Sequence, residues 1–230
     1  MKGLLALYLG ILAVSLTSFS LDAVSLGGTW VKQRTPSSVP VDLVLSTSYG
    51  LFSRCDSSSY FPSDVTCRPF PDRAKDCGKG AIGVFSSEEE DEEEERWDLC
   101  DSWITAGYAQ QLSLVFSLGN LLAIGLTLWG TATVGRGYRT ERLRSGWKLV
   151  AGLMSLQALC ALISTSLIAF ERNHDRRFSH GAHLARSWTM STVGYALNFA
   201  AVAVLLFVRA TGKLRIVPGE DGYAPIDDTA

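Results

Sequence analysis

Four long apolar stretches dominate the pattern of hydrophobic and polar positions along this 230-residue chain. They run over Leu4–Leu21, Ala106–Ala132, Leu149–Phe170 and Trp188–Val208, and none of them contains Asp, Glu, Lys or Arg. Each has about 18 residues or more, which lets a helix cross a hydrocarbon core of ~30 Å. A charged side chain at the bilayer centre costs about 2.5 kcal/mol or more. The pattern therefore predicts a membrane protein with four spans.

These stretches predict an all-α bundle of four transmembrane helices joined by one long and two short connections. The predicted segments are helix 1 (1–21), a first outer loop (22–105), helix 2 (106–132), a basic cytoplasmic loop (133–147), helix 3 (148–170), a second outer loop (171–187), helix 4 (188–209) and a cytoplasmic tail (210–230). A cleaved signal peptide is the alternative for the first stretch, because Lys2, Ser18 and Ser20 fit such a segment. The length of its apolar run favours a retained helix.

Charge is distributed unevenly along the chain and indicates its orientation. The first outer loop holds sixteen acidic and eight basic residues, so the net charge of −2 is only an average. Lys and Arg in short loops mark the cytoplasmic side. The side of the termini has nine such residues and the second outer loop has four. We therefore expect both termini in the cytoplasm of a multi-pass protein of the plasma membrane, and no binding of nucleic acid.

The first outer loop contains four of the five cysteines, namely Cys55, Cys67, Cys77 and Cys100. An even number of cysteines in a loop that faces an oxidising compartment indicates disulfides. Free thiols or a metal site are the alternatives. The spacing has no Cys-x-x-Cys pair, so we expect no zinc.

Alternating residues within Val39–Phe52 predict a half-buried β-strand in this loop, and Asp64–Pro69 is a candidate for a second short strand. A bridge between Cys55 and Cys67 would close a small loop across such a hairpin. A disulfide of this kind contributes about 2–4 kcal/mol to a module too small for a large core.

The same loop resembles the first outer loop of the claudin superfamily, which includes claudins, peripheral myelin and epithelial membrane proteins, and fungal claudin-like and PalI-type proteins. The resemblance rests on Trp30, on Gly50, Leu51 and Phe52, and on Cys55 and Cys67, which follow the pattern Trp … Gly-Leu-Trp-x-x-Cys … Cys. It implies a small disulfide-stapled antiparallel β-sheet in that loop, with Cys55 bonded to Cys67. Trp30 would pack at the base of the sheet or belong to an aromatic belt at the membrane surface. Gly50, Leu51 and Phe52 would end a strand and turn inward on the bilayer side. Elimination leaves Cys77 and Cys100 as the second pair.

The chain departs from the pattern of the claudins themselves, which limits the resemblance to part of the superfamily. Phe52 stands where the family has Trp, no arginine opens the second span, and the C-terminus lacks the hydrophobic motif of claudins. The chain is therefore most similar to the fungal claudin-like and PalI-type proteins.

An acidic run lies between Cys77 and Cys100, and it consists of Glu88, Glu89, Glu90, Asp91, Glu92, Glu93, Glu94 and Glu95. Blocks of like charge repel one another, which favours a solvated insert. The alternative is a surface that attracts cations near the membrane.

Polar side chains inside the spans and histidines in the second outer loop are further candidates for a structural or functional role. Asn120, Gln157 and Asn198 are amides that we expect to face the bundle and bond between helices. With no acid or base in any stretch, the sequence offers no proton relay. His174, His180 and His183 lie in the second outer loop, where they are either solvated or report the outside pH.

The chain has no nucleophile motif, zinc-protease motif, phosphate loop or dinucleotide fingerprint. We therefore expect a non-enzymatic membrane organiser of claudin-like type, without cofactor, metal or small-molecule substrate. Its expected partners are the lipid bilayer, further copies of itself or other membrane proteins. An accessory sensor of ambient pH or the cell wall, and an ion-conducting pore or channel subunit, are the alternative functions.

Overall fold

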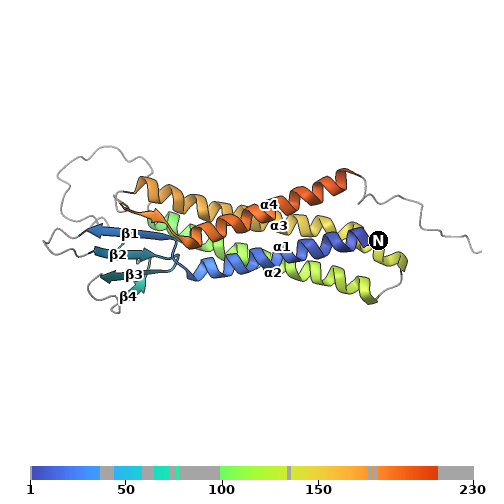
Figure 1. Cartoon of the computed structure of the whole chain (residues 1–230), viewed down its shortest axis with the longest axis horizontal. Helices are drawn as coiled ribbons and strands as arrows, with labels where there is room; N and C mark the ends of the chain where they lie inside the picture. The colour runs from blue at the N-terminus through green and yellow to red at the C-terminus, as the bar shows by residue number, and fades with distance from the viewer. Residues whose placement is uncertain are drawn as a thin grey trace, which may run out of the picture.

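The computed structural model describes residues 2–36, 44–58, 65–72, 76–77, 99–133, 136–175, 178 and 181–211. Its four helices are α1 (Lys2–Gly27), α2 (Leu99–Thr133), α3 (Arg136–His174) and α4 (Arg186–Ala210). Figure 1 shows them side by side in an elongated bundle, with a β-sheet at one end and the N-terminus at the other. Each helix is long and apolar enough to cross a membrane. The four predicted apolar helices are therefore confirmed.

Three helices begin or end well beyond the predicted bounds. The first helix runs to Gly27 instead of residue 21, and the second begins at Leu99 instead of residue 106. The third begins at Arg136 instead of residue 148, so most of the segment predicted as a basic loop, 133–147, is helical. The predicted outer loop from residue 22 to 105 is therefore too long at both ends. Apolar content defines only the part of a helix that suits lipid, whereas a helix with polar positions continues wherever neighbouring elements satisfy them.

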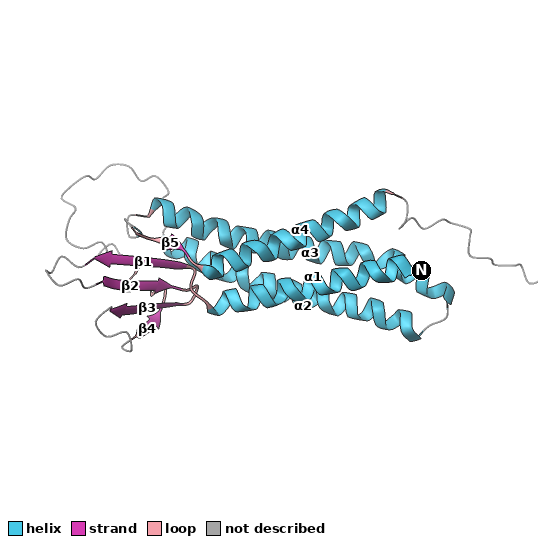
Figure 2. Cartoon of the chain, in the orientation of Figure 1, coloured by secondary structure: helices cyan, strands magenta, loops and turns pink. Residues whose placement is uncertain are grey.

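The β-sheet has five antiparallel strands in the order β4-β3-β2-β1-β5. Their bounds are β1 (Val31–Pro36), β2 (Val44–Tyr49), β3 (Ser53–Ser58), β4 (Thr66–Pro69) and β5 (His183–Leu184). Figure 2 shows the four longer strands projecting together from the end of the bundle. The fifth strand comes from the connection between α3 and α4, so both predicted outer loops contribute to one sheet. The small antiparallel sheet is thus confirmed.

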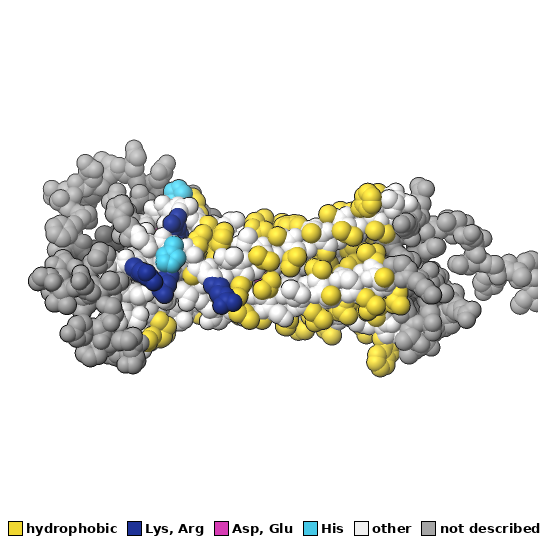
Figure 3. Space-filling view, in the orientation of Figure 1, with side chains coloured by type: hydrophobic (Ala, Val, Ile, Leu, Met, Phe, Trp, Pro, Cys, Tyr) yellow, Lys and Arg dark blue, Asp and Glu magenta, His cyan; other side chains and the backbone are white. Residues whose placement is uncertain are grey.

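The bundle is apolar outside and buries many polar side chains beside an apolar core that includes Ile124 and Met154. Each helix packs against two neighbours, α1 and α3 each contacting α2 and α4. Leucine, isoleucine, valine and aromatic side chains are exposed on the helices, among them Leu16, Leu122, Ile163 and Val204. Serines and amides are buried between the helices, among them Ser18, Ser117, Asn120 and Asn198. Figure 3 shows apolar side chains over the helices, while the basic and histidine side chains gather near the sheet. This distribution suits a lipid environment, in which polar groups find partners only within the protein.

Candidate functional site

Trp30 joins the first helix to the sheet at the point where both meet. Its indole N–H donates to the carbonyl of Ser25 at 2.7 Å. Its backbone N–H donates to Tyr49 and its carbonyl accepts from Ala185, each at 2.7 Å. The residue has no exposed surface. Trp30 therefore packs at the base of the sheet, as the resemblance implied, and its buried ring cannot serve as a lipid-facing belt residue.

An aromatic cluster fastens the sheet to the helix ends. Tyr49 on β2 lies with its ring centre 5.2 Å from those of Phe70 and Phe178. Trp103 on α2 contacts the same rings, at 5.2 Å from Phe70 and 5.8 Å from Phe178. Its indole N–H also donates to the Gly50 carbonyl at 3.1 Å. Aromatic pairs of this kind contribute about 0.5–1.5 kcal/mol each beyond the burial of their area, so sheet and bundle form one packed unit.

The Gly50-Leu51-Phe52 segment turns the chain from β2 into β3. A Cβ at Gly50 would lie 3.2 Å from the carbonyl oxygens of Gly28 and Ser53, so the position needs glycine for close packing. Leu51 is buried in the aromatic cluster, as expected. Phe52 instead lies 46% exposed and covers Gly107 of α2. The expected inward turn is therefore correct for Leu51 and wrong for Phe52. The helix α2 continues toward the sheet beside this strand, and the Phe52 ring lies against it.

Both predicted disulfides are present. Cys55 on β3 and Cys67 on β4 lie opposite each other in the antiparallel register. Cys77 is bonded to Cys100 in the first turn of α2, which ties the end of the sheet segment to the helix.

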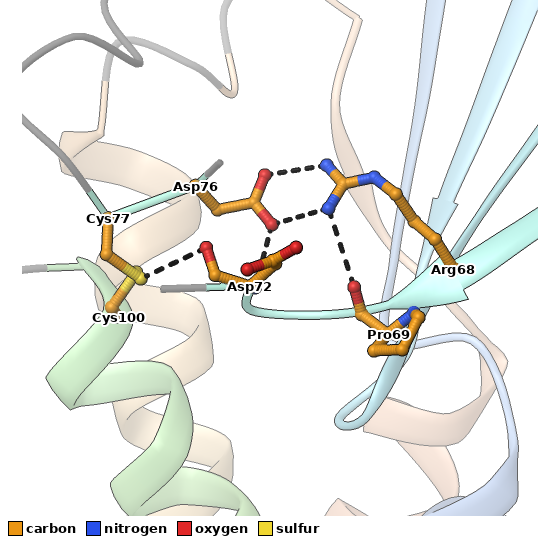
Figure 4. Close-up of a disulfide and its surroundings, with 6 residues drawn as sticks. All are labelled: Arg68, Pro69, Asp72, Asp76, Cys77 and Cys100. Carbon is orange, nitrogen blue, oxygen red and sulfur yellow. Dashed lines mark hydrogen bonds and ion pairs between the residues drawn. A yellow bond between two sulfur atoms is a disulfide. The ribbon is translucent and has the colours of Figure 1, made fainter. Parts of the chain in front are cut away.

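Beside the second bridge, Arg68 and Asp76 form a bidentate ion pair with both distances at 2.6 Å (Figure 4). The backbone N–H of Asp72 donates to the same carboxylate at 2.9 Å. The Arg68 guanidinium, helped by this N–H, lowers the pKa of Asp76 from its ordinary value. The pair holds the segment that precedes Cys77 against β4.

A buried carboxylate lies in the bundle near the sheet end, where the sequence predicted none. Asp22 falls inside α1 and is only 1% exposed. Its side chain accepts hydrogen bonds from Gln110 at 3.3 Å, Ser113 at 3.1 Å and Gln157 at 3.1 Å. The expectation that the spans contain no acid is therefore wrong. The carboxylate can lie inside the helix bundle because two other helices, α2 and α3, supply three donors to it.

The surrounding side chains extend this polar cluster across the whole bundle. Gln110 on α2 accepts a hydrogen bond from Ser191 on α4. Ser18 on α1 accepts hydrogen bonds from Gln157 on α3 and Asn198 on α4, at 3.2 and 2.9 Å. These bonds connect helices that are diagonal as well as adjacent, so the cluster occupies the centre of the bundle. We call the residues Ser18, Asp22, Ser25, Gln110, Ser113, Gln157, Ser191 and Asn198 the Asp22 cluster.

The predicted role of the three amides is confirmed. Asn120, Gln157 and Asn198 are fully buried, and each donates to a serine of α1. A signal for Asp22 also exists in the sequence. Ser15, Ser18, Asp22 and Ser25 follow one another at intervals of three, four and three residues, which places them on one face of a helix. That stripe extends the first helix past the end of its apolar run.

Two of the three histidines from the second predicted outer loop lie in the described residues. His174 stacks on Phe170 with ring centres 4.1 Å apart, and His183 lies on β5. The acidic run from residue 88 to 95 and His180 lie outside the described residues. Within the part of the chain that the structure describes, no three His, Cys, Asp or Glu side chains gather in a way that could hold a metal ion.

A scan against protein-family models finds none that matches this chain, and a search of curated proteins finds no match.

Proposed function

We propose that this chain is a non-enzymatic plasma-membrane protein of claudin-like type, which organises membrane domains or cell contacts through its outer sheet and through lateral packing of its helices. The termini would be cytoplasmic and the sheet would face the exterior. The observation that carries the proposal is the rigid attachment of a disulfide-stapled sheet to a bundle suited to lipid.

The helices support the lateral part of the proposal. Their exposed side chains are mostly apolar, whereas the buried ones include many serines and amides. In water such a molecule would hide its polar groups and expose its apolar ones, which opposes the hydrophobic effect. In a bilayer the same exterior faces hydrocarbon, and it can pack against a second copy or another membrane protein.

The sheet supports the contact part of the proposal. Its base is joined to α1, α2 and α4 through Trp30, Trp103 and the hydrogen bond between Ala185 and Trp30. A surface fixed in this way loses little conformational entropy when it binds a partner. Two exposed apolar side chains, Leu45 on β2 at 40% and Val65 just before β4 at 52%, are candidates for the contact.

Fluorescence microscopy of the tagged protein tests this proposal. We expect the wild type to concentrate in stable membrane patches. Leu45→Glu and Val65→Glu should disperse the patches while surface delivery stays normal, because both side chains are exposed and support no core. Leu45→Thr and Val65→Thr are matched controls, because threonine suits a β-strand and adds no charge. A wild type spread evenly over the membrane would contradict the proposal.

The two alternative functions predict other outcomes. A sensor of ambient pH or the cell wall would keep its patches after a sheet substitution, yet a deletion strain would lose its response to alkaline pH or wall stress. A pore would give ionic currents in reconstituted bilayers, and these would fall when the acidic run is neutralised.

A further inference from the structure

The hydrogen bonds around Asp22 match an ionised carboxylate. Gln110, Ser113 and Gln157 all donate to its side-chain oxygens, and both oxygens are used. An ionised carboxylate is purely an acceptor, so three donors satisfy it well. The side chain is 1% exposed, however, and bulk water cannot balance its charge.

Among the described residues, none supplies a counter-charge to this carboxylate. Every partner of Asp22 is a neutral amide or hydroxyl group. A buried charge without a partner of opposite sign is strongly unfavourable, and neutral donors compensate for it only in part. The described structure therefore leaves one negative charge to be balanced inside the bundle.

Two further oxygen atoms near Asp22 have no hydrogen-bond partner in the part of the chain that the structure describes. They are Oε1 of Gln157 and Oδ1 of Asn198, and both side chains are fully buried. Gln157 bonds directly to Asp22, and both amides donate to the hydroxyl of Ser18. Buried carbonyl oxygens without a partner are costly. Together with the carboxylate they form a set of hard oxygen ligands of the kind that suits a hard cation.

We propose that the Asp22 cluster binds a small monovalent cation of the Na⁺ class. The carboxylate provides one negative charge, which one monovalent ion neutralises. A divalent ion would leave a net positive charge in the bundle. The ligand oxygens would come from Asp22, Gln157, Asn198 and the nearby serine hydroxyls. This inference is independent of the proposed organiser function.

The cluster lies close to the sheet end of the bundle. Asp22 lies five residues before the end of α1 at Gly27, which is about 7.5 Å along a helix at about 1.5 Å per residue. On α4, a Cβ at Gly194 would lie 3.2 Å from Asp22 Oδ1 and 3.4 Å from the Ser18 hydroxyl. A larger side chain at this position would therefore crowd the proposed ligand oxygens.

Thermal unfolding of the purified full-length protein in detergent tests this site. Na⁺ is varied at constant pH, and N-methylglucamine replaces it so that ionic strength stays constant. We expect the midpoint to rise by roughly 3–6 °C for each tenfold increase of Na⁺ above its dissociation constant. Asp22→Asn should abolish this dependence. Asp101→Asn, which neutralises an exposed acid at the start of α2, should retain it.

Direct binding of radioactive sodium to the wild type decides the question if Asp22→Asn does not fold. We expect one Na⁺ per chain, with weaker binding in Gly194→Ala, whose added methyl group would occupy the space beside Asp22. Absence of bound Na⁺, or the same Na⁺ dependence in Asp22→Asn as in the wild type, would overturn the proposal. A midpoint that follows pH but not Na⁺ would overturn it too, because the group would then bind a proton instead.

Discussion

At the scale of single residues, the ion pair between Arg68 and Asp76 predicts a pH-dependent contribution to stability. Arg68 holds the pKa of Asp76 below its ordinary value of 3.8. A lowered pKa in the folded state stabilises the protein above the unfolded pKa, and this stabilisation is lost as pH falls through the folded value. Arg68→Met should therefore reduce the free energy of unfolding by about 1–2 kcal/mol at neutral pH, a modest figure because Arg68 is 30% exposed.

Thermal unfolding measured over a series of pH values checks this prediction. The difference between wild type and Arg68→Met should shrink below about pH 4, where the carboxylate takes up its proton. Arg34→Met on strand β1, elsewhere in the same sheet, is the control, because Arg34 is exposed and should show no such trend. A difference that stays constant down to low pH would show that the pair is not the cause.

Gly50 gives a second prediction at this scale. Its surroundings on two sides are backbone carbonyl oxygens of Gly28 and Ser53, which cannot rotate away from an added methyl group. Gly50→Ala should therefore lower the free energy of unfolding by about 1–3 kcal/mol. Gly27→Ala is a close control, since nothing lies within 4 Å of a Cβ at that position. Equal unfolding midpoints for the two variants would refute this account.

The sequence predicts the buried amides but misses the buried acid, for a physical reason. Amides in an apolar stretch must find partners, so their inward orientation follows from the cost of leaving them in lipid. Asp22 sits at the edge of such a stretch, where a helix and a loop are equally consistent with a charge. Only the donors on Gln110, Ser113 and Gln157 decide between them, and these come from two other helices.

At the scale of elements, the hairpin of β3 and β4 depends on its disulfide. Cys55 and Cys67 are bonded across the two strands with a sequence separation of 12 residues, and β4 lies at the edge of the sheet. Cys55→Ser with Cys67→Ser should destabilise the protein by about 2–4 kcal/mol and reduce its delivery to the cell surface. Cys160→Ser, which changes the free cysteine of α3, should leave the unfolding midpoint and surface delivery nearly unchanged. Normal surface delivery and an unchanged midpoint in the double variant would contradict the prediction.

The strands show where sequence periodicity suffices and where it does not. The predicted strand over Val39–Phe52 is confirmed at Val44–Tyr49, and its part from residue 39 to 43 lies outside the described residues. The predicted Asp64–Pro69 strand appears as Thr66–Pro69. Strands β1 and β3 were not predicted because their sequences, VKQRTP and SRCDSS, are too polar to show an apolar face. Their pairing with β2 creates them, and β5 forms only because the second loop reaches β1.

At the scale of the whole molecule, the four apolar stretches were enough to predict a four-helix bundle, because length and hydropathy alone identify such helices. The way in which the sheet is attached could not be predicted. It depends on Trp103, which was predicted to lie in the first outer loop, and on Phe178, which comes from the connection between α3 and α4. Contacts between segments so distant in sequence leave no local pattern.

The apolar exterior predicts which positions reach water in the native membrane. Thr35 on β1 and Leu122 in the middle of α2 are both exposed on the protein surface, the latter at 61%. If the helices span a bilayer, water reaches only the first of them, although both side chains face away from the protein. We therefore expect a membrane-impermeant maleimide to label Thr35→Cys in intact cells, because the proposed orientation has the disulfide-bonded sheet facing the exterior. The same reagent should not label Leu122→Cys, even after permeabilisation, since hydrocarbon surrounds that position.

Both substitutions belong in a Cys160→Ser background, which removes the free thiol of α3. Labelling of Leu122→Cys in intact membranes would show that the bundle is not embedded as proposed, and labelling of Thr35→Cys only after permeabilisation would reverse its orientation.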